Sequence, residues 1–300
     1  MNWWRAMGTI IEQVMVTRAG WLRRHSALHL AVAAAQSCLG KAGCSPDGLD
    51  LLVNAGLYRD RNLGEPALAA LIQDDIGAHP EDPHTGDHGT FSFDIANGTC
   101  GVLTALQIVD GFLRSGVIER ALVVASDADP GHRLSERFPF SAAGGAALCR
   151  WTDDRYGLGP VHWVNDLDRG ESFRATVGQA DNRNILRFQV SDSLDDDYAA
   201  AGHEAVSACL RQAKIALAEV DFIVAAPARP AFRSALATRL GSASSRVIVA
   251  DDEYIHTAAL IAGLAREKPR RFAGSRTMLV AAGAGVTAGA ALYDVPPESD

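Results

Sequence analysis

The chain is short of cationic side chains and has no long apolar run. Its 28 lysines and arginines are outnumbered by 36 aspartates and glutamates, which gives a formal net charge of −8. A nucleic-acid surface needs a concentrated basic face, so this balance argues against a nucleic-acid partner. A membrane-spanning helix needs about 18 or more consecutive apolar residues, and the sequence offers none, which argues against a membrane partner.

The cysteines also lack the patterns that would assign them a role. No CxxC pair and no Cys/His spacing typical of zinc occurs, so no metal site is expected. The odd number of cysteines and the lack of a signal peptide predict a reduced, cytoplasmic setting. The five cysteines are Cys38, Cys44, Cys100, Cys149 and Cys209.

What the sequence does contain is a strand that runs through a tight turn into a long helix, from Phe93 to Gly116. The turn reads NGTCG, and a helix start offers unpaired N–H groups and a positive dipole end. A cysteine in that position is expected to have a lowered pKa and raised reactivity. The alternative is that Cys100 is a small buried hydrophobic residue. Helical spacing is indicated by Val102, Leu103, Leu106, Val109, Leu113 and Val117.

The order of elements is repeated along the chain. A helix LAVAAAQSCLGKAG precedes the strand LDLLVNAG, and a helix EAVSACLRQAKIAL precedes the strand VDFIVAAP, with Asp50 and Asp221 opening the two strands. Later, RALVVASDADP and RTMLVAAGAG are each followed by a segment that contains GAAL. Continuous Val/Leu/Ile runs predict strands buried on both faces, and alternation with helices predicts parallel units. We therefore expect a duplicated α/β fold, with one half in residues 1–155 and the other in residues 156–300.

These features together resemble the thiolase superfamily, and within it β-ketoacyl-ACP synthase III. The family signature FD-hydrophobic-xAACAGF…AL…SG aligns without gaps on Phe93 to Gly116, and FGDGAGAA resembles Phe140 to Ala147. The C-terminal FGGGFTWGSAL resembles Ala282 to Leu292, and VPHQAN…ATAKKLG resembles VAAPARPAFRSALATRLG. The resemblance implies a thiolase-like αβαβα sandwich of two similar halves.

The catalytic residues that the resemblance would imply are replaced. The family uses Cys, His and Asn for decarboxylative condensation; in gapless register the Cys falls on Thr99 and the His on Ala226. The family's Asn loop falls on residues 253–259, which contain no Asn. An alkyl hydroxyl needs a partnered base to ionise, and the loss of oxyanion donors removes electrostatic stabilisation. Condensation by the usual route is therefore not expected.

Three candidate residues remain for acyl transfer. Either Thr99 or Cys100 occupies the apex of the turn, and bending at Asn97 and Gly98 would favour Cys100. His256 lies in the loop that carries a catalytic side chain in the family, and a Cys–His pair would suit acyl transfer. The alternative for His256 is a capping or surface histidine.

Two further features follow from the resemblance. The backbone amides of Gly283 and Gly285 correspond to the family's oxyanion loop, and backbone donors survive side-chain substitution. Arg18, in VTRAGWLRRH, corresponds to a residue associated with coenzyme A. No tightly bound cofactor is implied; acyl-CoA or acyl-phosphopantetheine would be the substrate.

Two functions from different classes fit the sequence. The first is a ketosynthase III-like acyltransferase that takes an acyl group from a CoA or acyl-carrier-protein thioester. The second is a catalytically inactive subunit that partners an active ketosynthase homologue. Binding of a small molecule in a repurposed pocket is a third hypothesis. The resemblance also implies a homodimer or heterodimer formed through the strand Thr90 to Ile95, with the helix Gly64 to Gln73 beside it, and acyl carrier protein as a further partner.

Overall fold

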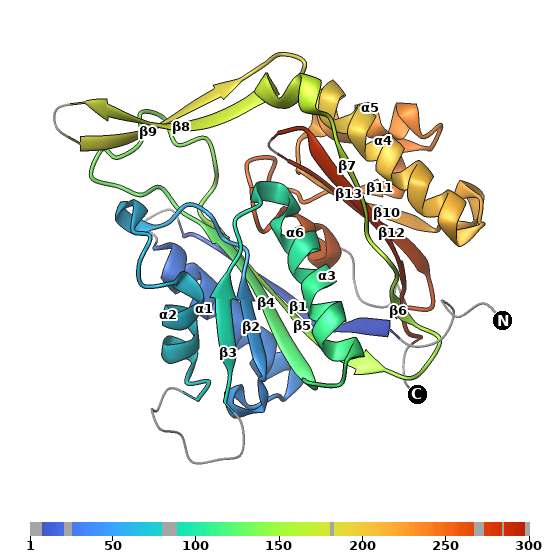
Figure 1. The fold of residues 1–300 in the computed structure, drawn as a ribbon, viewed down its shortest axis with the longest axis horizontal. Helices are drawn as coiled ribbons and strands as arrows, with labels where there is room; N and C mark the ends of the chain where they lie inside the picture. The colour runs from blue at the N-terminus through green and yellow to red at the C-terminus, as the bar shows by residue number, and fades with distance from the viewer. Residues whose placement is uncertain are drawn as a thin grey trace.

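The computed structural model describes residues 8–20, 26–79, 89–180, 183–266, 273–283 and 285–297. Two halves of one five-layer sandwich can be followed in Figure 1, each built on a mixed sheet. The first sheet has the spatial order β1-β5-β4-β2-β3. Its strands are β1 (Gly8–Arg18), β2 (Leu51–Asn54), β3 (Phe91–Asp94), β4 (Arg120–Asp127) and β5 (Ala143–Thr152), and its helices are α1 (Ala27–Ala42), α2 (Leu68–Ile76) and α3 (Gly101–Arg114).

The second sheet repeats this order, with β11-β10-β12-β13 followed by β6, and with β7 also paired to β13. β10 runs parallel to its neighbours β11 and β12, as β2 runs parallel to β3 and β4 in the first sheet. β13 runs antiparallel to β12, as β5 runs antiparallel to β4. The strands are β6 (Gly157–Leu158), β7 (His162–Asn165), β10 (Phe222–Ala226), β11 (Val247–Ile248), β12 (Arg276–Gly283) and β13 (Thr287–Asp294), and the helices are α4 (Leu194–Ala213), α5 (Pro230–Arg239) and α6 (Ala259–Arg266).

The repeat extends to the residues that open the inner strands. The Asp50 carboxylate accepts hydrogen bonds from the backbone N–H groups of Glu119 and Arg120 at the start of β4. The Asp221 carboxylate accepts one from the N–H of Arg276 at the start of β12. The predicted duplicated α/β fold is therefore confirmed. The division at residues 155 and 156 remains a proposal; β5 ends at Thr152 and β6 begins at Gly157.

The central layer consists of α3 and α6, which lie between the two sheets (Figure 1). Alternate strand residues face opposite sides: Leu51 and Val53 pack on the central helices, and Leu52 packs on α1 and α2. In the second sheet, Val224 faces the central layer and Ile223 faces α4 and α5. Both faces of each sheet are covered, which explains why the strands read as continuous apolar runs.

Local sequence sets the ends of the helices. Ser26 caps α1 by accepting a hydrogen bond from the N–H of His29, and Gly43 ends it at a φ of 63°. α3 ends at Arg114, one turn earlier than its apolar spacing predicts. Val117 was expected on its buried face but lies beyond the helix end and is 67% exposed.

The elements that were not predicted include a β-hairpin made of β8 (Phe173–Ala180) and β9 (Arg183–Val190). In Figure 1 it extends from the N-terminal end of α4 across the top of the first half of the molecule. Its strand β9 is bridged to Ser135, and Leu186 exchanges backbone hydrogen bonds with Leu134 and Glu136. No helix in the described ranges is both long and apolar enough to cross a membrane.

Candidate functional site

The turn between β3 and α3, residues Asn97–Gly101, is the elbow at the centre of the molecule. Gly98 has a φ of 48°, which an L-residue adopts only with strain, and it opens a short 3₁₀ turn that leads into α3. The Asn97 carbonyl accepts the N–H of Cys100 at 3.0 Å, and the Asn97 side chain donates to Thr104 at 3.0 Å. Hydrogen bonds made by Asn97 therefore stabilise the conformation of this turn.

Thr99, one of the two residues expected at the apex of the turn, points into the interior. Its side chain is 5% exposed, and its hydroxyl donates a hydrogen bond to the carbonyl of Ala282 at the end of β12. A Cβ atom added to Gly283 would lie 3.0 Å from the Thr99 Oγ1. The hydroxyl thus faces the strand end and not His256, so the structure gives Thr99 no base to activate it.

Cys100 is fully buried, which contradicts the expectation of an activated thiol. Its Sγ lies 3.5 Å from the carbonyl oxygen of Thr287 and also packs on Gly283. Burial raises the pKa of the Cys100 thiol to about 12. Desolvation therefore outweighs the helix N-terminus, and the pKa of Cys100 is raised where a lowered one was expected. The alternative interpretation, a small buried hydrophobic residue, describes it correctly.

His256 is the catalytic candidate that the structure places at the elbow. Its Nδ1 lies 3.2 Å from Oδ2 of Asp127, at the C-terminal end of β4, and its ring is 8% exposed. A carboxylate only accepts hydrogen bonds, so Nδ1 carries a proton, and in the neutral imidazole the lone pair is on Nε2. A Cβ atom added to Gly98 would lie 3.6 Å from Nε2, so this edge of the ring faces the elbow.

Asp127 holds this arrangement in place by accepting four further hydrogen bonds. The donors are the N–H groups of Leu57, Tyr58 and Thr257 at 3.3, 2.9 and 2.9 Å, and the Thr257 hydroxyl at 2.6 Å. Burial alone would raise the pKa of the Asp127 carboxyl, but His256, Thr257 and Tyr58 together hold it below its ordinary value. Asp127 is therefore ionised at neutral pH.

Aromatic rings surround the imidazole. The ring of Phe140 stacks on His256 with centroids 4.0 Å apart, and the ring of Tyr58 lies 5.5 Å away at a tilt of 31°. Phe138 and Phe188 pack on Tyr58 at 5.6 and 5.4 Å, so the hairpin is fastened to the first half by ring contacts. Apolar rings therefore surround the polar pair of His256 and Asp127.

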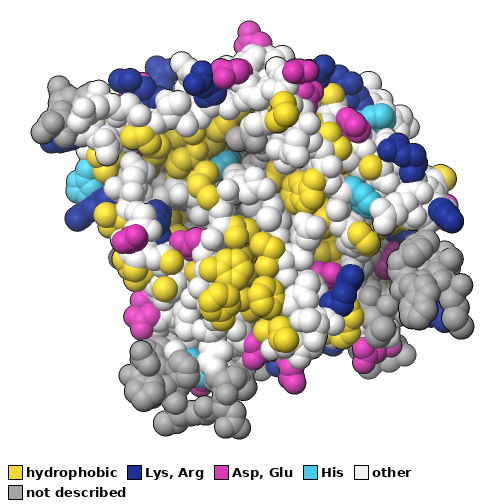
Figure 2. Space-filling view, viewed as in Figure 1, with side chains coloured by type: hydrophobic (Ala, Val, Ile, Leu, Met, Phe, Trp, Pro, Cys, Tyr) yellow, Lys and Arg dark blue, Asp and Glu magenta, His cyan; other side chains and the backbone are white. Residues whose placement is uncertain are grey.

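A cavity of about 470 Å³ opens beside Gly98 and His256. Its walls come from the segment after β2, the elbow, strand β8 and the loop before α6. Figure 2 shows hydrophobic side chains gathered below the hairpin, with a histidine surface beside them. The lining residues are Leu57, Tyr58, Ala96, Asn97, Gly98, Phe173, Arg174, Ala175, Thr176 and His256. We call this space the His256 cavity.

The other predicted site residues do not line the His256 cavity. Gly283 packs against Thr99 and Cys100 beneath the elbow, and Gly285 follows in the β12–β13 turn with a φ of 74°. Arg18 is the last residue of β1, is exposed and pairs with Ala143. The structure brings His256 to the elbow but brings neither Arg18 nor the two glycines into the cavity.

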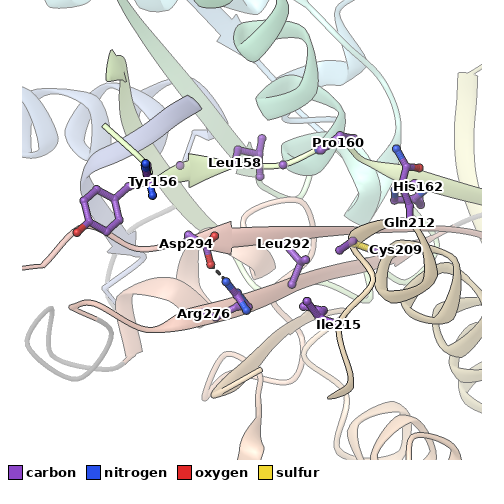
Figure 3. Close-up of a pocket in the computed structure, with 14 residues that line it drawn as sticks. Tyr156, Leu158, Pro160, His162, Cys209, Gln212, Ile215, Arg276, Leu292 and Asp294 are labelled. Atoms are coloured by element: carbon purple, nitrogen blue, oxygen red, sulfur yellow. Dashed lines mark hydrogen bonds and ion pairs between the residues drawn. The ribbon is translucent and has the colours of Figure 1, made fainter. Parts of the chain in front are cut away.

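A second cavity, of about 210 Å³, lies between the C-terminal end of α4 and the strands β6 and β13. Figure 3 shows Arg276 paired with Asp294 on one side, with Cys209, Gln212 and His162 on the other. It shares no lining residue with the His256 cavity. The described ranges contain no group of three or more His, Cys, Asp or Glu side chains placed to hold a metal ion.

The sequence interpretation missed Asp127 and Tyr58. Asp127 could have been found as a carboxylate at the C-terminal end of a continuous apolar strand, in VVASDADP, where buried charge requires partners. Tyr58 follows the neighbouring strand in the same way, in LVNAGLY. Carboxyl ends of parallel strands meet at one edge of a sheet, which is where functional side chains gather in α/β folds.

No protein-family model matches the chain, but individual relatives match along nearly all of it. It is 28% identical to β-ketoacyl-[acyl-carrier-protein] synthase III of a Bradyrhizobium species, over 93% of this chain and 89% of that protein. The same enzyme of Salmonella typhi is 28% identical, over 94% and 90% of the two chains.

Solved structures agree on the fold. The structure of 3-oxoacyl-(acyl carrier protein) synthase III from Pseudomonas aeruginosa has a TM-score of 0.78 at 18% identity, covering 98% of this chain and 100% of that one. The priming β-ketosynthase of the R1128 polyketide pathway has a TM-score of 0.79 at 19% identity, covering 97% of each chain. The expected thiolase-like fold is confirmed.

Proposed function

From a chain that has the thiolase fold and resembles β-ketoacyl-ACP synthase III over most of its length, we propose a ketosynthase III-like acyltransferase. It moves an acyl group from a CoA or acyl-carrier-protein thioester to a hydroxyl, amine or thiol acceptor. The observation that supports this is the imidazole of His256, held by Asp127 with its free Nε2 toward the elbow and the cavity. This is the arrangement of a general base with an orienting carboxylate.

The proposed transfer is direct and has no acyl-enzyme intermediate. The acceptor's O–H, N–H or S–H proton passes to Nε2 of His256 while its heteroatom attacks the thioester carbonyl carbon. The new bond to carbon forms, and the carbon–sulfur bond then breaks. The departing thiolate takes the proton from Nε2, which restores the neutral imidazole. Asp127 stabilises the imidazolium that exists between these two proton transfers.

The buried side chains beneath the elbow support a direct route. The Cys100 thiol and the Thr99 hydroxyl both point away from the His256 cavity and are engaged with carbonyl oxygens. Ala226, the last residue of β10, is fully buried where the family has its histidine. Neither a covalent carrier nor a pair of enolate donors is therefore part of the proposal, and malonyl decarboxylation is not expected.

The donor class rests on the resemblance and on the cavity. The names of the relatives specify acyl carrier protein, and a cavity of about 470 Å³ with mostly apolar walls suits an acyl chain. No residue role here requires a tightly bound cofactor. Acyl-CoA or acyl-phosphopantetheine would enter as substrate.

A specific observation also favours the second candidate function, a catalytically inactive subunit that partners an active homologue. Thr99 and Cys100, the two candidates for the nucleophile, are both buried. A subunit that performs no covalent chemistry would not need either side chain to be accessible. The two candidates differ in whether the isolated chain transfers acyl groups at all.

A pairing surface fits either candidate. β3 is the edge strand of the first sheet, where the expected strand Thr90–Ile95 lies, and Phe91 on it is 60% exposed and packs on Phe93. Figure 2 shows a hydrophobic patch over this part of the molecule. We propose that β3 joins a second copy or a ketosynthase homologue, because an unpaired apolar edge otherwise invites aggregation. A monomer in light scattering, with and without the homologue, would remove this proposal.

The experiment that tests the function is release of free thiol from a panel of acyl-CoA and acyl-carrier-protein donors, with alcohol, amine and thiol acceptors. The acyltransferase is expected to release thiol only when an acceptor is present and to yield the acylated acceptor by mass spectrometry. Intact mass of the protein should stay unchanged throughout. No turnover with any pair would favour the inactive-subunit function, and an acyl adduct on the protein would contradict the direct route.

A further inference from the structure

The proposed transfer needs a donor for the oxygen of the attacked carbonyl. Negative charge develops on that oxygen in the transition state, and one donor alone is typically worth about 100- to 1000-fold in rate. The backbone amides expected for this role, at Gly283 and Gly285, do not line the His256 cavity. The donor must therefore come from another residue of the cavity wall.

Tyr58 is a polar side chain of that wall. Its side chain is 6% exposed and lines the His256 cavity. The fully enclosed side-chain polar atoms that lack a hydrogen-bond partner in the described ranges are Arg120 Nε and the hydroxyls of Ser126, Ser135 and Ser242. The Tyr58 hydroxyl is not one of these enclosed, unpaired atoms, and the cavity is the open space that Tyr58 lines.

The same carboxylate positions Tyr58 and His256. The Tyr58 N–H donates to Oδ1 of Asp127 at 2.9 Å, and Nδ1 of His256 lies 3.2 Å from Oδ2. The two rings are tilted by 31° with centroids 5.5 Å apart. One buried group therefore fixes the base and the phenol relative to each other, which is what a preorganised site requires.

We propose, on the basis of the function above, that Tyr58 is a catalytic residue whose hydroxyl donates a hydrogen bond to the thioester carbonyl oxygen. The hydroxyl makes this bond to the ground-state carbonyl and strengthens it as the oxygen becomes negative. No proton is transferred from Tyr58.

The surroundings suit a fixed, neutral donor. Phe138, Phe140 and Phe188 pack on the Tyr58 ring with centroids 5.6, 5.5 and 5.4 Å away, so the ring has little freedom to turn. Burial, and to a lesser extent the charge of Asp127, raises the pKa of Tyr58. The phenol therefore stays protonated at every pH at which the protein would work, and it can only donate to a carbonyl oxygen.

The test compares two non-reactive ligands that differ in the carbonyl. The first is the ketone analogue of octanoyl-CoA, with a methylene in place of the thioester sulfur. The second is the same molecule with a methylene in place of the carbonyl as well, so the two ligands differ only in the C=O group. Calorimetry measures both dissociation constants for the wild type, for Tyr58→Phe, which removes only the hydroxyl, and for Tyr198→Phe. Tyr198 is also buried but does not line the His256 cavity, so it is the matched control.

The wild type and Tyr198→Phe are expected to prefer the ketone by about five- to tenfold, which is what one hydrogen bond contributes. The Tyr58→Phe variant should bind the two ligands equally. An unchanged preference in Tyr58→Phe, no preference in the wild type, or an equal loss in Tyr198→Phe would overturn the assignment of Tyr58 alone. Binding of neither ligand to the wild type would show that the proposed thioester site itself fails, and the assignment would fail with it.

Discussion

Nδ1 of His256 lies 3.2 Å from Oδ2 of Asp127, although the two residues are 129 positions apart in the sequence. His256 comes from the loop before α6 and Asp127 from the end of β4, so the contact forms only when the two sheets pack on their shared central helices. The pair combines a base with the carboxylate that orients it. This contact supports both the proposed chemistry and the stability of the site.

The Asp127→Asn substitution is expected to destabilise the protein by about 2–4 kcal/mol at pH 7, because five donors lose their carboxylate acceptor. The folded-state pKa of Asp127 is lowered. Its contribution is therefore present above the unfolded pKa of about 3.9 and lost as the pH falls through the lower folded value. Urea unfolding from pH 7 to pH 3 should show the gap between wild type and variant closing.

The exposed residue Asp129 provides the control for that series, since Asp129→Asn should change stability little at any pH. A stability gap for Asp127→Asn that widens toward acid would mean that the carboxyl is protonated in the folded state, contrary to the lowered pKa.

The Cys100 thiol is expected to stay unmodified by iodoacetamide at pH 7.5 in the folded protein, because burial raises its pKa to about 12 and leaves almost no thiolate. Cys100→Ala should retain acyl transfer while losing about 1 kcal/mol of stability through the cavity it leaves. Peptide mapping after labelling in the presence and absence of urea measures the first effect. Rapid native labelling of Cys100, or loss of transfer in the folded Ala variant, would restore it as a nucleophile.

The Thr99→Val substitution keeps the shape of the side chain and removes its hydroxyl. It should cost about 1–2 kcal/mol of unfolding free energy, since the bond to the Ala282 carbonyl is lost in a buried place. Transfer activity should be preserved, because the hydroxyl has a structural role. Thermal unfolding and thiol release are measured on the same preparation, and a stable but inactive Val variant would contradict this account.

The β8–β9 hairpin is expected to depend on Phe188, whose ring contacts Tyr58, Phe138, Phe140 and Phe173. Phe188→Ala should speed hydrogen exchange in the hairpin amides and weaken substrate binding, because β8 forms a wall of the His256 cavity. Arg187→Ala is the control; it keeps every ring contact and removes the exposed ion pair with Glu136, which contributes less than about 1 kcal/mol, together with the contact of the guanidinium on Gly178. Equal exchange in the two variants would show that the ring contacts do not fasten the hairpin.

The fold could be predicted because its signals are local and repeated. Strands such as β4 and β12 are continuous apolar runs, and the helix-strand order recurs with Asp50 and Asp221 in matching places. The hairpin also had a local signal that was missed. Phe173, Ala175 and Val177 alternate with polar or small residues, which is the two-residue period of a strand.

The site was less predictable because its determinants are tertiary. His256 was identified from its place in the family's loop, whereas its partner Asp127 is brought in by the packing of the two sheets. The position of Cys100 at a helix start suggested a lowered pKa, but full burial acts in the opposite direction and is larger. Burial of one side chain cannot be judged from a turn motif alone, since it depends on the strand end at Ala282–Gly283 that covers it.

The most direct test of the proposal is single-turnover acyl transfer by the wild type and by His256→Gln, which keeps a polar side chain of similar reach but cannot accept a proton. General-base catalysis of this kind contributes about 10²- to 10⁴-fold, so the Gln variant should be slower by that factor while it binds the ketone analogue as tightly as the wild type. Transfer at an unchanged rate by His256→Gln, with the variant folded and saturated with donor, would contradict the role of His256.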